Sequence, residues 1–231
     1  MLWRYMDLAK LMSLLESRTL HFSRYDQFLD LSEGLLSKPT LESYRQSIGF
    51  KNDAKLFQDF ERWINKLGRK YAYASCWNAG PHERAVLWSN YGSTIAIQTT
   101  VEQFKKCFED APDREPVMLA HLRYGDLSVL NMEKDNVWRP VTYKDIRYED
   151  EHEVRAIYID DRYRRESSTE TPKAPRSTPK AVFAAIDPNV LIEQVVVAPG
   201  TSPWVLKLVK KICVRYGIDA PVAASHLMHR G

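Results

Sequence analysis

Two glutamates, Glu151 and Glu153, are the residues of this sequence whose type and spacing best suit chemistry, and they precede an apolar segment at 154–159. Side chains alternate between faces along an extended strand, so both glutamates and Arg155 are expected on one face. Two carboxylates at that spacing repel each other unless a cation or a polar ligand lies between them. The pair is therefore either a catalytic acid pair or a strand end neutralised by Arg155 and solvent.

Further candidates lie on or at the ends of other predicted strands. Arg4 lies in a short opening strand, Ser23 and Arg24 end a second strand, and Ser75 lies in a third. The 6 Trp, 12 Tyr and 8 Phe of the chain are enough for a sizeable core and for stacking a flat ligand. Each of these features taken alone is more often structural, because such arginines are commonly surface cations and such serines and tryptophans commonly lie in the core.

Several classes of function lack their sequence signatures here. The chain has no phosphate-binding loop, no dinucleotide GxGxxG motif, no nucleophile elbow and no kinase signature. Its three cysteines and six histidines show no metal-ligand spacing, so no metal site is expected. A net charge of +3 is too small to indicate nucleic-acid binding by itself. Dispersed cysteines, and apolar runs much shorter than roughly 18 residues, predict a cytoplasmic protein without membrane contact.

The elements that must position these residues do not alternate regularly between strand and helix. The apolar patterns predict strands at 2–5, 19–23, 71–77, 93–99, 117–124, 153–159, 181–186 and 192–198. They predict helices near 8–15, 101–108 and 203–216. This order favours an α+β fold in a single domain over residues 1–231, with a mixed, largely antiparallel sheet flanked by helices.

Two regions are distinct from this pattern. Residues 40–68 form a predicted helical segment whose aromatic stripe packs on or over the sheet, with Gly49 and Gly68 as helix stops. Residues 166–180 contain no large apolar side chain, which predicts a mobile loop insertion.

The order of several segments also suggests a family. These segments cover 2–5, 20–34, 73–77, 87–97, 148–155 and 195–200, and the blocks at 88–92 (Trp-Ser-Asn-Tyr-Gly) and 151–155 (Glu-His-Glu-Val-Arg) are the most specific. Over nearly its whole length the chain thus resembles the bacterial domain of unknown function 2971. Two departures stand out: the family's Asn-Asp-Pro-Phe-Glu turn is Leu-Asp-Leu-Ser-Glu at 29–33, and 166–180 looks like an insertion.

The resemblance extends to what the protein does. Members of that family are similar to proteins of bacterial anti-phage defence, and their motif order resembles that of ADP-ribosyltransferases. The resemblance implies an ADP-ribosyltransferase-like fold. Arg4, Ser75 and Glu153 would take the three positions of its motif, on the first strand, a middle strand and a late strand. Glu151 would match the first acid of a Glu-x-Glu pair.

The implied activity is that of an NAD-consuming ADP-ribosyltransferase or NAD glycohydrolase, acting as a toxin or defence effector. Glu153 would stabilise an oxocarbenium-like state, and Glu151 would orient or deprotonate the acceptor. Arg4 or Arg24 would hold the pyrophosphate or ribose of NAD. The remaining implied binding residues are Ser23, Ser75, Trp77, Trp88 and Tyr91. The acceptor, whether nucleic acid, protein or water, stays open, and so does any antitoxin or defence partner.

Two other functions fit the same residues. A metal-dependent nuclease would bind Mg²⁺ through Glu151, Glu153 and a third acid, Asp30 or Glu33. It would show three carboxylates beside a lysine, together with a basic groove. A non-catalytic sensor or binding module would instead have its glutamates neutralised by Arg155 and other cations.

Overall fold

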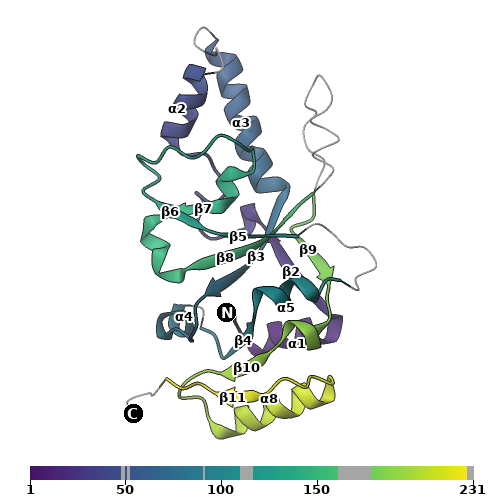
Figure 1. Ribbon diagram of the computed structural model, residues 1–231. Helices are drawn as coiled ribbons and strands as arrows, with labels where there is room; N and C mark the ends of the chain where they lie inside the picture. The colour runs from purple at the N-terminus through teal and green to yellow at the C-terminus, as the bar shows by residue number, and fades with distance from the viewer. Residues whose placement is uncertain (48–49, 51–52, 91, 110–116, 161–177, 228–231) are drawn as a thin grey trace. The chain divides into compact units, whose positions relative to one another are not determined.

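The computed structural model describes residues 1–47, 50, 53–90, 92–109, 117–160 and 178–227 (Figure 1). These residues form an α+β fold in which most strands pair antiparallel and helices flank them, as the sequence predicts. The chain divides into two compact units: unit 1 comprises 1–21, 76–115 and 183–231, and unit 2 comprises 22–75 and 116–182. Because each unit draws on distant parts of the sequence, the expected single domain over 1–231 stays a prediction.

Unit 1 is built on strands in the order β11-β10-β4-β1-β3, of which only the β10–β11 pair is parallel. Its strands are β1 (Leu2–Met6), the second half of β3 (Ala72–Ala79), β4 (Ile95–Thr99), β10 (Gln194–Val197) and β11 (Val222–Ala224). Its helices are α1 (Leu8–Ser17), α4 (Ala85–Asn90), α5 (Val101–Lys106), α7 (Pro188–Leu191) and α8 (Pro203–Arg215).

Local sequence signals account for where several of these helices begin. The side chain of Asp7 accepts a hydrogen bond from the backbone nitrogen of Lys10 at 2.8 Å, and Thr100 caps α5 in the same way through Gln103 at 3.1 Å. Such caps satisfy backbone donors that have no partner in the first helical turn. Within α5, Phe104 is buried, whereas Val101 is exposed.

Unit 2 contains the strand neighbours β5-β8-β3-β2, and its printed pairs β5–β8 and β2–β3 are antiparallel. These strands are β5 (Val117–His121), β8 (Glu153–Ile159), the first half of β3 and the second half of β2 (Thr19–Arg24), whose first three residues belong to unit 1. Strand β9 (Ala181–Ala185) pairs with β2 and is likewise divided between the two units. A separate parallel pair joins β6 (Arg123–Gly125) to β7 (Tyr143–Asp145). Among its described residues, unit 2 also contains the short 3-10 helices η1 (Tyr25–Gln27), η3 (Arg139–Thr142) and η4 (Ile146–Glu151).

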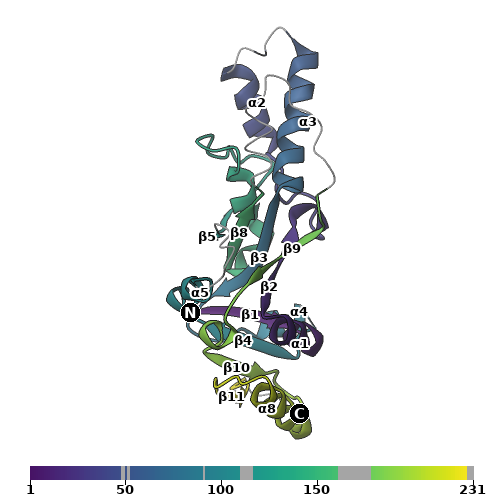
Figure 2. The same cartoon turned by 90° about the vertical axis from the view of Figure 1, so that its right-hand side faces the viewer.

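The predicted helical segment at 40–68 is the pair α2 (Lys38–Ser47) and α3 (Ala54–Lys70), which lie side by side (Figure 2). Its apolar side chains pack around Leu41 and Ile64 against Met132 and Tyr143. The aromatic stripe therefore serves core packing. Gly68 does not stop the helix, because α3 continues through it to Lys70; Gly49 lies outside the described residues.

The predicted mobile loop at 166–180 is described only from residue 178 onward. At that end Thr178 is buried and donates a hydrogen bond to the backbone oxygen of Lys70 at 2.8 Å, and the mobility of the segment stays a prediction. The hydroxyl of Tyr73 donates to the carbonyl of Pro179 at 3.0 Å. Among the residues that the structure describes, no helix combines the length and the apolar character needed to cross a membrane.

Candidate functional site

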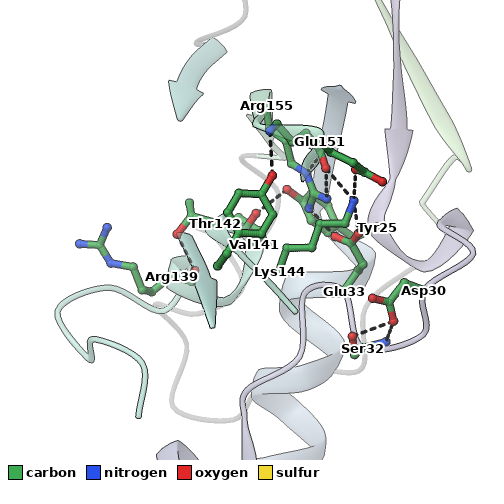
Figure 3. Close-up of polar contacts among 12 residues, drawn as sticks. Tyr25, Asp30, Ser32, Glu33, Arg139, Val141, Thr142, Lys144, Glu151 and Arg155 are labelled. Atoms are coloured by element: carbon green, nitrogen blue, oxygen red, sulfur yellow. Dashed lines mark hydrogen bonds and ion pairs between the residues drawn. The ribbon is translucent and has the colours of Figure 1, made fainter. Parts of the chain in front are cut away.

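Five charged side chains meet in unit 2 around the start of β8 (Figure 3). They are Glu33, Lys144, Glu151, Glu153 and Arg155, and each is between 1% and 15% exposed. We call this set the charge cluster. Three carboxylates and two cations are thus removed from most of their water, which is costly unless each charge has a partner.

Lys144 lies between the two glutamates that the sequence singles out. Its Nζ donates to Glu151 Oε2 at 2.6 Å and to Glu153 Oε2 at 2.8 Å, and lies 3.7 Å from Glu33 Oε1. Burial alone would lower the pKa of Lys144, but attraction to Glu153 and the hydrogen bonds that Lys144 donates to both glutamates hold it well above its usual range. The cluster therefore contains a fixed ammonium group at physiological pH.

Arg155 binds the other side of Glu153. Its Nε donates to Glu153 Oε1 at 2.6 Å, and its Nη2 donates to Glu153 Oε2 at 3.2 Å. Its Nη1 forms an ion pair with Glu33 Oε2 at 2.5 Å. The guanidinium also lies 5.2 Å from the ring centroids of Tyr25 and Phe28, where cation–π attraction adds to the packing. Both oxygens of Glu153 are thus engaged by cations.

A change of backbone direction at His152 brings Glu151 to the cluster. Glu151 ends η4, His152 adopts the left-handed conformation with φ 45°, and Glu153 begins β8. Strand alternation therefore places only Glu153 and Arg155 on the expected shared face. Glu151 reaches the cluster from the preceding 3-10 helix. The backbone nitrogen of Glu153 donates to the hydroxyl of Tyr124 at 2.7 Å, and burial raises the pKa of Tyr124 to about 12.

Glu33 reaches the cluster because its neighbour, Gly34, lies unusually close to α3. Gly34 has φ +76°, a conformation that glycine adopts readily. A Cβ atom at Gly68 would lie 2.5 Å from the Gly34 carbonyl oxygen, so only glycine fits there. Sequence reasoning offered Glu33 as one possible third acid and, for a nuclease, expected a lysine beside the carboxylates, but it did not identify Lys144, because one lysine in a polar segment has no periodic signal.

Ser75 and Glu153 lie on different faces of their strands. On β3, Ala72 and Ala74 share a core cluster with Tyr25 and Ile157. Ile157 lies on the same face of β8 as Glu153 and Arg155. The ring of Tyr73, on the other face of β3, lies 5.8 Å from that of Tyr158. Because side chains alternate along a strand, Ser75 lies on the same face of β3 as Tyr73. The structure therefore does not bring Ser75 to Glu153, in contrast to what the resemblance implies.

Arg24 is engaged in contacts of its own and is therefore ill suited to hold a ligand. Its Nε and Nη2 donate to the two carboxylate oxygens of Asp26 at 2.6 and 3.0 Å. Its Nη1 donates to Thr178 Oγ1 at 2.8 Å and to the carbonyl of Pro179 at 3.2 Å. Ser23 precedes it on the opposite face of β2 and is paired with Ala74 in the register of β2 and β3.

The remaining predicted binding residues belong to unit 1. The guanidinium carbon of Arg4 lies 5.7 Å from the ring centroid of Trp77, and burial lowers the pKa of Arg4 to about 10. Trp77 is fully buried, and Trp88 is only 6% exposed and packs edge-on against Tyr5. Neither indole offers an open ring face to a nicotinamide. Tyr91 lies outside the described residues.

Arg4 and Glu153 belong to different units, so their expected convergence stays a prediction.

The carboxylates of the cluster do not form a metal site. No group of three or more His, Cys, Asp or Glu side chains in the described part of the chain could hold a metal ion. The place between Glu151 and Glu153, where a divalent ion would bind, is taken by the ammonium of Lys144. Asp30, the other proposed third acid, instead accepts hydrogen bonds from the backbone nitrogen and hydroxyl of Ser32 at 2.9 and 2.7 Å.

Comparison with known proteins gives no match: no family model, no curated protein and no solved structure corresponds to this chain. The resemblance to the domain of unknown function 2971 therefore stays a prediction.

Proposed function

We propose that unit 2 carries a metal-independent active site that cleaves the nicotinamide–ribose bond of NAD, with Glu151 and Glu153 as its acid pair. One observation carries the proposal. Both carboxylates bind the same ammonium nitrogen, at 2.6 and 2.8 Å, which brings them near the roughly 5–5.5 Å separation of retaining glycosidases. Glycoside hydrolysis and NAD cleavage both pass through an oxocarbenium-like state, which a nearby carboxylate stabilises.

The burial of the two glutamates separates their roles within this proposal. The side chain of Glu151 is 15% exposed, whereas that of Glu153 is 4% exposed and bound by two cations. Glu151 is therefore the carboxylate that reaches the substrate and meets the positive charge developing on the ribose. Glu153 is a positioning residue: it fixes Lys144, and Lys144 fixes the orientation of Glu151. This assignment reverses the roles that the resemblance implies.

The acceptor of ADP-ribose would be water, a protein side chain or a nucleic-acid base. A role as a bacterial defence or toxin effector belongs to the same proposal. Its context rests on the resemblance at 151–155 and 88–92 alone.

The test is release of nicotinamide from NAD by the purified chain, repeated with Glu151→Gln and with Glu149→Gln. Glu149 is an exposed glutamate of the same 3-10 helix and provides the matched control. Loss of one electrostatic contact to the reacting centre typically lowers kcat by about 10²–10³. We expect that loss in Glu151→Gln and wild-type turnover in Glu149→Gln. Equal turnover in all three proteins would refute the acid-pair assignment.

A transferase needs its acceptor, so binding is measured beside turnover. NAD should raise the Tm of the wild-type chain, since a ligand that binds only the folded state stabilises it. If NAD gave no nicotinamide release and no shift in Tm, the NAD proposal would be refuted.

A second candidate function is non-catalytic binding or sensing, and one observation favours it. Lys144 and Arg155 give each of the three carboxylates a cationic partner, so the cluster needs no substrate to satisfy its charges. In that case, wild-type protein would be inactive towards NAD and also towards nucleic acid with Mg²⁺ present. Cleavage that depends on Mg²⁺ would instead favour the nuclease, in which the metal displaces Lys144.

A further inference from the structure

Helix α8 carries four basic side chains and no acidic one. Lys207, Lys210, Lys211 and Arg215 are all exposed, and the segment Pro203–Arg215 contains neither Asp nor Glu. Four positive charges on one short helix exceed the net charge of +3 for the whole chain, so the rest of the molecule is slightly acidic on balance.

The apolar side of α8 is already occupied. Val209 and Cys213 are buried, and the helix lies along β10 and β11 (Figure 1). On the outer side, two apolar residues remain in solvent: Trp204 is 65% exposed and Val214 is 79% exposed. A tryptophan so exposed buries little area against its own chain and leaves its ring available to a partner.

The four cations have no acidic partner in the part of the chain that the structure describes. None of them lies within an ion-pair distance of a described carboxylate, although the other arginines and lysines of the chain form many such pairs. Solvated charge runs are common, but this one combines uncompensated cations with an exposed indole. That combination is typical of surfaces that bind single-stranded nucleic acid, where cations follow the phosphates and aromatic rings stack on bases.

We propose that the outer face of α8 binds single-stranded nucleic acid. Lys207, Lys211 and Arg215 follow one another at intervals of four residues, which places them about 6 Å apart along one side of the helix, close enough to contact successive phosphates. Trp204, one turn before Lys207, stacks on a base. An anionic membrane is a poorer occupant, because the apolar face of an interfacial helix enters the bilayer and that face of α8 packs inside unit 1.

This inference does not depend on NAD cleavage, since α8 and the charge cluster lie in different units. Its test is fluorescence anisotropy of a labelled mixed-sequence oligonucleotide of about 20 nucleotides, titrated with the full chain between about 50 and 200 mM salt. We expect binding whose logarithm falls linearly with the logarithm of salt concentration. The double substitution Lys207→Glu and Lys211→Glu should weaken binding at least about tenfold and reduce the salt slope.

Two further variants make the test specific. Trp204→Ala should weaken binding several-fold while leaving the salt slope nearly unchanged, because stacking releases no counterions. Lys55→Glu with Lys66→Glu makes the same charge change on exposed positions of α3 and should retain wild-type affinity. Glu151→Gln should bind the oligonucleotide normally, so failure of the catalytic proposal is separable from failure of this one.

Either of two outcomes would overturn the inference. One is the absence of oligonucleotide binding at about 50 mM salt, including the case in which the chain binds vesicles of phosphatidylserine instead. The other is an equal loss of affinity in the α8 and α3 double variants, which would assign binding to total charge.

Discussion

The carbonyl oxygen of Gly34 lies so close to Gly68 that a Cβ atom at position 68 would come within 2.5 Å of it. Observed Cβ atoms do not approach a backbone oxygen so closely, so α3 can pass the chain at this point only with glycine there. Glu33 is covalently attached to Gly34. The contact between the two glycines therefore determines whether Glu33 can reach Arg155 and Lys144.

Gly68→Ala should consequently destabilise the protein, although alanine is normally the better helix former by about 1 kcal/mol. Overpacking against backbone typically costs about 1–3 kcal/mol, so we expect a clear fall in Tm. Gly80→Ala is the control, because a Cβ there would meet its nearest neighbour at an ordinary 3.6 Å. A Gly68→Ala protein as stable as wild type would show that α3 does not depend on this contact.

Glu153→Gln should unfold the protein more readily than Glu151→Gln does. Both oxygens of Glu153 accept hydrogen bonds from cations, so the amide NH₂ of a glutamine would face a donor in either orientation. Breaking a buried ion pair typically costs about 3–5 kcal/mol. Glu151 is more exposed, and its substitution should cost less.

Urea denaturation of both variants measures this difference. Equal stabilities would mean that Glu153 is less tightly bound than its contacts indicate. The same reasoning makes Glu151→Gln the better variant for the NAD experiment, since a loss of activity in Glu153→Gln could reflect a loss of fold.

The sequence predicts those features of the fold that depend on neighbouring residues. The strand that follows the acid pair is confirmed, and so is the helix of unit 1 that begins at Pro203. Each depends on a short pattern: a polar side chain before an apolar period, or an unbroken apolar run. The mixed, largely antiparallel architecture follows from the order of these patterns.

The composition of the charge cluster could not be predicted in the same way. Glu33 contacts Lys144 and Arg155 from a distant part of the chain, and Lys144 contacts Glu153 from a different strand. These contacts depend on the parallel pairing of β6 and β7 and on the close approach at Gly68. The face on which Ser75 lies is set by which face of β3 packs against Ile157. Such long-range packing leaves no periodic signal in the sequence.

Arg4→Met should leave the stability of the protein unchanged or raise it. No carboxylate in the described residues forms an ion pair with Arg4, and its lowered pKa of about 10 reflects burial of the charge. Methionine keeps much of the side-chain volume and removes the cost of desolvating a cation, at the loss of a cation–π contact with Trp77 worth about 1 kcal/mol.

The measurement is thermal unfolding of both proteins in the same low-salt buffer. A fall in Tm of many degrees in Arg4→Met would mean that the guanidinium has a stabilising partner.

Asp26 should make stability depend on acid pH. Burial alone would raise its pKa, but hydrogen bonds from Arg24 and Lys70 hold the pKa of this carboxyl well below its usual range. A carboxyl whose pKa is lower in the folded than in the unfolded state stabilises the fold above its unfolded pKa of about 3.9, and this contribution is lost as the pH falls below that value. Asp26→Asn should therefore lower stability at pH 7 and flatten the loss of stability between about pH 5 and 2.

The free energy of unfolding in urea, measured from pH 7 to pH 2, tests the contribution of Asp26. Asp219→Asn is the matched control, because Asp219 is exposed and has no ion pair among the described residues, so its pH profile should follow that of the wild type. Arg24 also joins Thr178 to β2, and Asp26→Asn leaves that link in place. A variant profile as steep as the wild-type profile would show that other carboxylates account for the acid sensitivity.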